Sequence, residues 1–157
     1  MGLTTVGGTA YAAPARNSGD SRDAQETRDS RGAREPASPV GSWTVLITVE
    51  GMPEPERGHF SFHADGQLVM HSVSSSGLGT GIGSWRAEGQ GFGYVLRSAR
   101  VDAEGRFLYE LRIRQEARLT SRGVFTSRGS GTAVAPDGTV LMERAAEAAG
   151  TRFGFND

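Results

Sequence analysis

Hydrophobic and polar residues alternate without a break through residues 106–120, RFLYELRIRQEARLT. Every second residue from Phe107 to Leu119 is apolar with one exception, and the residues between them are mostly Glu and Arg. A period of two predicts an extended strand with one face in a core and a mixed-charge face in solvent. The exception is Gln115. A buried amide without partners costs roughly 1–3 kcal/mol, so Gln115 indicates either a bound ligand or an internal hydrogen bond.

Residues 41–50, GSWTVLITVE, form another alternating segment and open the folded part of the chain. A three-residue turn at 64–66, Ala-Asp-Gly, is expected to join the next two strands, because glycine readily adopts the left-handed conformation that such a turn needs. This turn predicts that Phe62 pairs with Leu68 and Phe60 with Met70. A two-residue turn would instead pair Phe60 with His71. We prefer the first register because it keeps His59, His63 and His71 outside.

A pair of histidines four residues apart, at 59 and 63, has metal-ligand spacing on a helix. On a strand, four residues span about 13 Å, which is too far for one ion. The glycine- and serine-rich residues 74–83 lack the lysine and the following helix of a phosphate-binding loop. We therefore expect no metal site at the histidines and a flexible connection between strands at 74–83.

The turns on either side of residues 106–120 predict the partners of this strand. A four-residue loop at 102–105 pairs it with residues 91–101 as follows: Ser98 with Tyr109, Leu96 with Leu111, Tyr94 with Ile113, Phe92 with Gln115 and, on the other face, Arg97 with Glu110. The turn at 121–123 pairs it with residues 124–134 as follows: Leu119 with Phe125, Ala117 with Ser127, Gln115 with Gly129, Ile113 with Gly131 and Leu111 with Ala133. Small residues thus face Gln115, which indicates either a space for a ligand or a tightly bent corner of a barrel.

The last hairpin turns at Pro136-Asp137-Gly138 and predicts that Gly131 pairs with Glu143 on the inner face. A carboxylate would then lie in the interior, where burial raises its pKa. Because the alternation in residues 141–150 is weak, an outward Glu143 with Arg144 turned inward is the alternative.

Composition bounds the possible functions. The chain has 157 residues, 36% hydrophobic, with a net charge of −1, which favours one domain and gives no electrostatic sign of nucleic-acid binding. Without cysteine there are no disulfides, no thiolate chemistry and no cysteine-bound metal. No apolar run approaches the roughly 18 residues of a membrane helix. We expect a cytoplasmic protein; export is the alternative, because TTVGGTAYAAPA near the start resembles a leader cleavage site.

Residues 1–40 differ from the rest of the chain, since they contain no Phe or Trp and carry matched acids and arginines at 18–35. Such a segment buries too little apolar surface to offset its ordering entropy, so we expect disorder. A lid over the barrel, a linker and a leader remnant are the alternatives. Residues 41–157 are then the folded domain: a closed antiparallel up-and-down β-barrel of eight or nine strands, with a two-sheet sandwich as the alternative. Closure is favoured because it removes the edges that long strands would expose.

The segment Gly41-Ser42-Trp43 and Arg152 near the end of the chain resemble the lipocalin (calycin) signature, in which an arginine from the closing strand covers a tryptophan at the barrel base. The spacing of FxFxADGxL, of GxGxW at 81–85 and of the PDG turn also resembles small lipocalin-like proteins of actinobacteria. They include the barrel cyclases of polyketide pathways that form spirotetronate and spirotetramate rings by Diels–Alder-type (4+2) cycloaddition. The resemblance implies the barrel fold, a structural Trp43–Arg152 pair and, for the N-terminal extension, a lid.

We therefore predict a cofactor-free, metal-free cyclase that acts on a hydrophobic small molecule; a non-catalytic carrier or sensor of such a molecule is the alternative. A barrel with a filled core and no ligand is a third interpretation. The catalytic candidates are Gln115 as hydrogen-bond donor, Tyr109 near it, and Glu143 as polar anchor or base. The substrate-binding candidates are Met70, Trp85, Phe92, Tyr94, Leu96, Ser98, Leu111, Ile113, Gly129 and Gly131. Neither nucleic acid nor a membrane is expected as a partner, and the protein is expected to be a monomer or homodimer.

Overall fold

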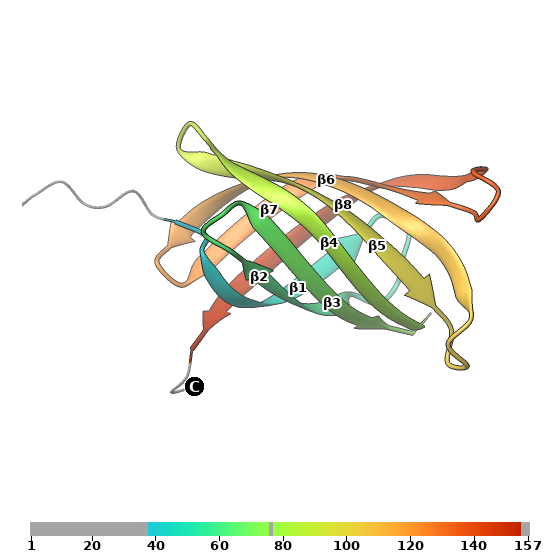
Figure 1. The fold of residues 1–157 in the computed structure, drawn as a ribbon. Coiled ribbons are helices and arrows are strands. Elements are labelled where there is room, and N and C mark those ends of the chain that lie inside the picture. Colours follow the sequence, from blue (N-terminus) through green and yellow to red (C-terminus); the bar gives the residue numbers. More distant parts are fainter. Residues whose placement is uncertain (1–37, 76, 155–157) are drawn as a thin grey trace, which may run out of the picture. The chain divides into compact units, whose positions relative to one another are not determined.

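The computed structural model describes residues 38–75 and 77–154. These residues form eight antiparallel strands joined by short turns, and β1 pairs with β8, so the sheet closes into an up-and-down barrel (Figure 1). The strands are β1 (Gly41–Val49), β2 (Glu56–Phe62), β3 (Gln67–Ser74), β4 (Gly77–Glu88), β5 (Gly91–Val101), β6 (Phe107–Ser121), β7 (Val124–Val134) and β8 (Val140–Phe153). The predicted all-β barrel is confirmed, and the alternative of a two-sheet sandwich is wrong.

The two ends of the barrel differ. At the end called here the base, the indole of Trp43 is fully buried and lies under the guanidinium of Arg152, whose carbon is 4.6 Å from the ring centroid. Aromatic side chains fill the space above it with edge-to-face contacts: Phe62, Phe92 and Phe125, with Trp85 packed beside them. Because these rings exclude water and fit edge to face, the base is a solid core rather than a cavity. The opposite end, where β1 ends and β8 begins, is called the mouth.

Two predicted registers are confirmed. The turn after β2 has Gly66 at a φ of 87°, in the left-handed region, and the strands pair Phe60 with Met70 and Phe62 with Leu68. The three histidines are exposed as expected. Between β6 and β7, Gln115 lies opposite Gly129, and all the other partners predicted for this pair of strands are also found.

The predicted register of β5 against β6 is wrong by two residues: Tyr94 pairs with Gln115, and Arg97 pairs with Arg112 instead of Glu110. One residue of the shift comes from the loop, because Asp102 Oδ1 accepts hydrogen bonds from the backbone N–H groups of Glu104 (3.0 Å) and Arg106 (2.8 Å) and so draws Arg106 into the turn. The second comes from a bulge in β6. Val101 pairs with Phe107 and Arg100 pairs with Tyr109, so Leu108 has no partner on β5. Two single-residue shifts restore the original faces, so the inward and outward positions remain as predicted.

Two further predictions are wrong. Near the start of β8, Val134 pairs with Val140 but Ala133 pairs with Met142, so a bulge shifts the register by one residue. This shift turns Glu143 outward and Arg144 inward, which is the alternative stated for this hairpin. Residues 77–83 are not a loop but part of β4. Glycine suits this strand because a Cβ at Gly81 would lie only 3.0 Å from the Cα of Ser98, so β4 and β5 approach too closely for side chains there.

Candidate functional site: the barrel lumen

A cavity of about 80 Å³ lies between the aromatic base and the mouth. Its wall is mostly apolar and comes from six strands: Ile47 and Val49 of β1, Phe60 of β2, Met70 of β3, Tyr94 of β5, Leu111 and Ile113 of β6, and Met142, Ala146 and Ala148 of β8. Several polar residues border the same cavity, namely Glu56, Arg100, Gln115, Arg144 and Glu147, and Gly131 of β7 contributes backbone. An apolar cavity with a few convergent polar groups has the composition of a small-molecule site.

Gln115 is buried, with 4% of its surface exposed, and lines the cavity from the middle of β6. Its Nε2 donates a hydrogen bond of 3.3 Å to the carbonyl oxygen of Ala146. Its Oε1 is buried and has no hydrogen-bond partner among the described residues. If the amide were flipped, Oε1 of Gln115 would face the carbonyl oxygen of Ala146, and two acceptors would repel each other. The hydrogen bond to Ala146 therefore fixes the orientation of the amide. The prediction that Gln115 faces the interior is confirmed, but the free atom is an acceptor and not the donor that we expected.

Tyr94 is the second polar group of the wall, and its hydroxyl bonds to Ser127 Oγ at 3.0 Å. Burial disfavours the phenolate and raises the pKa of Tyr94 to about 12, although the hydrogen bond to Ser127 acts in the opposite direction. Tyr94 therefore keeps its proton at neutral pH. With its hydroxyl paired, it presents mainly an apolar ring to the lumen, packed edge to face on Phe60.

Arg100 is a lumen residue that the sequence reasoning missed. It is 5% exposed, lines the cavity from the mouth end of β5, and donates from Nη2 to Oε1 of Glu56 on β2 at 2.5 Å. The side chain of Glu56 is 12% exposed, so both partners of this ion pair are largely removed from water. The sequence pattern of β5 already indicated that Arg100 faces inward, because it continues the alternate inward positions of Phe92, Tyr94, Leu96 and Ser98.

Of the residues predicted to bind substrate or act on it, six line the cavity: Met70, Tyr94, Leu111, Ile113, Gln115 and Gly131. Trp85 and Phe92 belong instead to the packed base, where the Trp85 indole donates to the carbonyl oxygen of His63 at 2.8 Å. Leu96 and Ser98 are buried on the wall of β5 outside the cavity lining. Tyr109 is half-buried beside Arg100 toward the mouth. Glu143 is exposed, so its prediction as a catalytic residue of the lumen is wrong.

The two glycines opposite the strand of Gln115 have different roles. A Cβ at Gly129 would collide with the carbonyl oxygen of Arg114 and lie 2.9 Å from the Cα of Gln115, so the strands approach closely at this point. A Cβ at Gly131 would meet only Ile113 Cγ1 at 3.7 Å, an ordinary contact. Gly131 therefore borders the cavity, whereas Gly129 permits a tight approach of backbones and leaves no space for a ligand.

Large apolar side chains are exposed around the mouth. β8 pairs with β1 only from Ala146 onward, and the hairpin of β7 and β8 projects beyond the end of β1 (Figure 1). The exposed apolar residues at this end, named the rim, are Met52, Val73, Leu78, Phe107, Leu108, Val140, Leu141 and Met142. The rim adjoins the cavity through Met142, which belongs to both.

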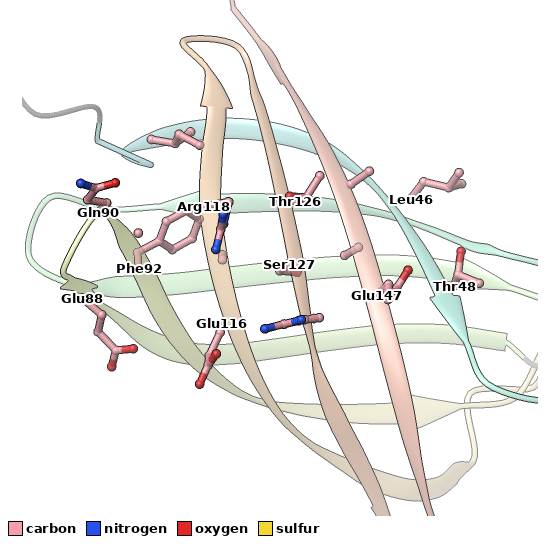
Figure 2. A pocket seen from close by; sticks show the side chains of 16 residues that line it. Leu46, Thr48, Glu88, Gln90, Phe92, Glu116, Arg118, Thr126, Ser127 and Glu147 are labelled. Atoms are coloured by element: carbon pink, nitrogen blue, oxygen red, sulfur yellow. The ribbon is translucent and has the colours of Figure 1, made fainter.

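A larger hollow, of about 960 Å³, lies on the outside of the barrel and is lined by β1, β6, β7 and β8 together with residues 88 and 90–92 at the turn from β4 to β5 (Figure 2). Its exposed side chains alternate in charge across the strands, with Glu116 opposite Arg128 and Arg128 opposite Glu147. Opposite charges on neighbouring strands compensate each other in water. We assign this hollow to the solvated surface and place the candidate site in the lumen.

Comparison with protein-family models, with curated proteins and with solved structures gives no match for this chain. In the part of the chain that the structure describes, no three His, Cys, Asp or Glu side chains are grouped to hold a metal ion. The described residues also include no helix long and apolar enough to cross a membrane. The prediction of a lid concerns residues that lie outside the described part of the chain.

Proposed function

We propose that the protein binds an elongated apolar small molecule in its lumen and promotes intramolecular cyclisation of that molecule without a cofactor. The observation that carries this proposal is the cavity itself, which combines an apolar wall with the unpaired Oε1 of Gln115. A filled structural core would leave neither the space nor the unpaired buried atom. The choice of reaction rests on the resemblance of the motif spacing to that of small lipocalin-like cyclases, whereas the arginine over the signature tryptophan supports only the lipocalin-like fold.

The cavity is small for such a ligand, since sites for drug-sized molecules enclose roughly 300–1,000 Å³. Two features allow a larger molecule. Met70 and Met142 line the cavity with flexible side chains that adapt to different shapes, and the exposed rim offers apolar contacts to a chain that extends through the mouth. We expect one end of the ligand to lie beside Gln115 and the remainder to reach the rim.

The reaction needs no nucleophile and no redox partner. In a (4+2) cycloaddition a conjugated diene and an alkene form two carbon–carbon σ bonds, three π bonds become one, and no proton or electron enters or leaves. Confinement of a linear chain in a folded conformer contributes to the rate because the ordering entropy is offset by binding energy. A hydrogen-bond donor on an electron-poor alkene lowers the barrier further.

A carrier or sensor is the second candidate, and one observation favours it. Two of the polar groups of the wall are hydrogen-bonded within the protein, Tyr94 to Ser127 and Gln115 Nε2 to the carbonyl oxygen of Ala146, so both already have a structural role that requires no substrate. A binding protein requires only the apolar contacts.

One experiment separates these functions. Purified protein is mixed with a linear polyene that carries a conjugated diene and an electron-poor alkene, and both binding and the rate and stereochemistry of ring formation are measured. Gly131→Leu, which fills the cavity, is compared with Thr132→Leu on the opposite face of β7. A cyclase accelerates ring formation and loses this acceleration only in Gly131→Leu. Binding without acceleration supports the carrier, and binding that is indifferent to Gly131→Leu contradicts both.

A further inference from the structure

The mouth half of the lumen holds a cluster of buried polar atoms that the packing leaves unused. Arg100 has two such atoms, Nε and Nη1, while its Nη2 bonds Glu56. Ser72 and Ser98 are 3% and 0% exposed, and the hydroxyl of each is buried. None of these four atoms has a hydrogen-bond partner among residues 38–75 and 77–154.

Strand pairing brings the cluster together. Ser72 of β3 lies opposite Gly79 of β4, and Gly79 lies opposite Arg100 of β5. A Cβ at Gly79 would be 2.5 Å from Ser72 Oγ and 2.8 Å from Arg100 Nη1. The guanidinium therefore lies across the bare backbone of Gly79 toward Ser72 and Glu56. Ser98, two residues before Arg100, faces the same interior.

Unused donors on a buried ion pair are unusual. A buried pair stabilises a fold only when its remaining hydrogen-bonding groups are also satisfied, and buried polar groups in native proteins nearly always have partners. Arg100 and Glu56 both line the lumen cavity, so a ligand there adjoins the guanidinium. The free Nε and Nη1 atoms are themselves buried, so the side chain has to rotate toward the cavity to donate to the ligand. The unused groups at this point are N–H donors and two hydroxyls that also donate, which matches a ligand atom that accepts hydrogen bonds.

We propose that the guanidinium of Arg100 forms a subsite for a carbonyl oxygen of the lumen ligand, with the hydroxyls of Ser72 and Ser98 near it but outside the cavity lining. Glu56 neutralises the guanidinium of Arg100, so this subsite favours the neutral oxygen of a ketone, ester or amide over a carboxylate. Arg144, the other arginine of the wall, donates instead to the carbonyl oxygen of Glu50. This subsite rests on the proposed function for the presence of a ligand. It also transfers the donor role in the cyclisation from Gln115 to Arg100, because a guanidinium N–H on a carbonyl withdraws electron density from the alkene attached to it.

The test uses two probes of nearly equal shape, 2-hexanone and 2-methyl-1-hexene, which differ in the carbonyl oxygen. Binding of each probe is followed by NMR through the methyl resonances of Ile113 and Met70, and the contact with the subsite through the side-chain Nε–H resonance of Arg100. The full chain is expected to bind the ketone at least about tenfold more tightly than the alkene, with a saturable shift of the Arg100 resonance for the ketone alone.

Variants separate the subsite from the fold. The double variant Arg100→Leu with Glu56→Leu removes the ion pair without leaving a lone charge; it is expected to bind both probes equally. Glu56→Gln frees the positive charge and is expected to gain at least about tenfold in affinity for hexanoate. Arg112→Leu, on the outer face of β6, is the control and is expected to keep the ketone preference.

The outcomes distinguish the two proposals. Equal binding of ketone and alkene to the unaltered protein, with no shift at Arg100, overturns the subsite and leaves lumen binding intact. Failure of both probes to perturb Ile113 and Met70 overturns the proposed function together with the subsite. If the double variant does not fold, the ketone-specific shift of Arg100 and the hexanoate gain of Glu56→Gln decide the question in the same way.

Discussion

The guanidinium of Arg152 covers the indole of Trp43 and at the same time binds the chain that enters the barrel. Arg152 donates from Nη1 to the carbonyl oxygen of Val40 at 2.9 Å and from Nη2 to that of Ser38 at 2.7 Å. The indole N–H of Trp43 donates to the carbonyl oxygen of Pro39 at 2.7 Å. The predicted pair is thus confirmed, and it fastens residues 38–40 across the base.

We expect Arg152→Ala to lower the melting temperature by about 5 °C or more. The substitution removes a cation–π contact worth about 0.5–2 kcal/mol and two hydrogen bonds to backbone carbonyls. Because the base lies away from the cavity, probe binding in the lumen is expected to remain within about twofold. Thermal unfolding followed by circular dichroism measures the first effect. Arg114→Ala, at an exposed position of β6, is the control, and equal melting temperatures for both variants would contradict the structural role.

Two truncations define how much of the N-terminal extension the barrel needs. Removing residues 1–36 retains the backbone carbonyls of Ser38, Pro39 and Val40, so the melting temperature is expected to stay near that of the full chain. Removing residues 1–40 deletes these three acceptors and is expected to lower it by several degrees. If residues 17–36 act as a lid, the shorter truncation also reduces ligand affinity or turnover. Full activity of that truncated protein would exclude the lid.

Gln115→Leu is expected to retain the fold, since a leucine of similar volume suits the apolar face of β6. It removes the free Oε1, which we expect to accept a hydrogen bond from a ligand hydroxyl or N–H. Binding of 1-hexanol is then expected to weaken about threefold to tenfold, while binding of 2-methyl-1-hexene is unchanged. Titrations followed by NMR measure both. An equal affinity of the variant and the parent for 1-hexanol would mean that Gln115 serves only its internal bond to Ala146.

Gly129 and Gly131 form a matched pair for testing the packing of β7. Gly129→Ala places a methyl group against the backbone of Arg114 and is expected to destabilise the fold by about 1–3 kcal/mol. Gly131→Ala meets only Ile113 at an ordinary contact distance and is expected to change stability by less than about 0.5 kcal/mol. Urea unfolding of the two variants measures the difference. A larger loss for Gly131→Ala would contradict the positions described here.

The turn between β5 and β6 is expected to weaken in acid. The backbone N–H of Arg106 is the main cause that holds the pKa of Asp102 below its ordinary value, and the Arg106 side chain and Glu104 N–H add to it. A carboxyl group with a lowered pKa in the folded state contributes stability above its unfolded pKa and loses it as the pH falls through the folded value. NMR titration of Asp102 measures this pKa, and Asp102→Asn is expected to reduce the dependence of stability on pH in that range. An ordinary pKa for Asp102 would contradict the turn geometry.

Much of the architecture follows from the sequence because it depends on local pattern. Alternation predicts which residues face inward, and glycine-containing turns predict where strands end, so the barrel, the buried Gln115 and the register of β6 against β7 were all predictable. The lipocalin-like signature likewise predicted that Arg152 covers Trp43.

The features that the sequence did not predict depend on single-residue bulges and on contacts between residues far apart in the sequence. A bulge inserts one residue into a strand, and an alternating sequence pattern does not reveal where this happens. Between β5 and β6, two one-residue shifts left every side chain on its predicted face. In β8, a single shift turned Glu143 outward and Arg144 inward. The ion-pair partner of Arg100 could not be predicted from local pattern either. Glu56 lies 44 residues away in the sequence, and β3 and β4 separate its strand from that of Arg100. The cavity and its unpaired donors exist only once all eight strands close, since cavity volume depends on how side chains from every strand pack together.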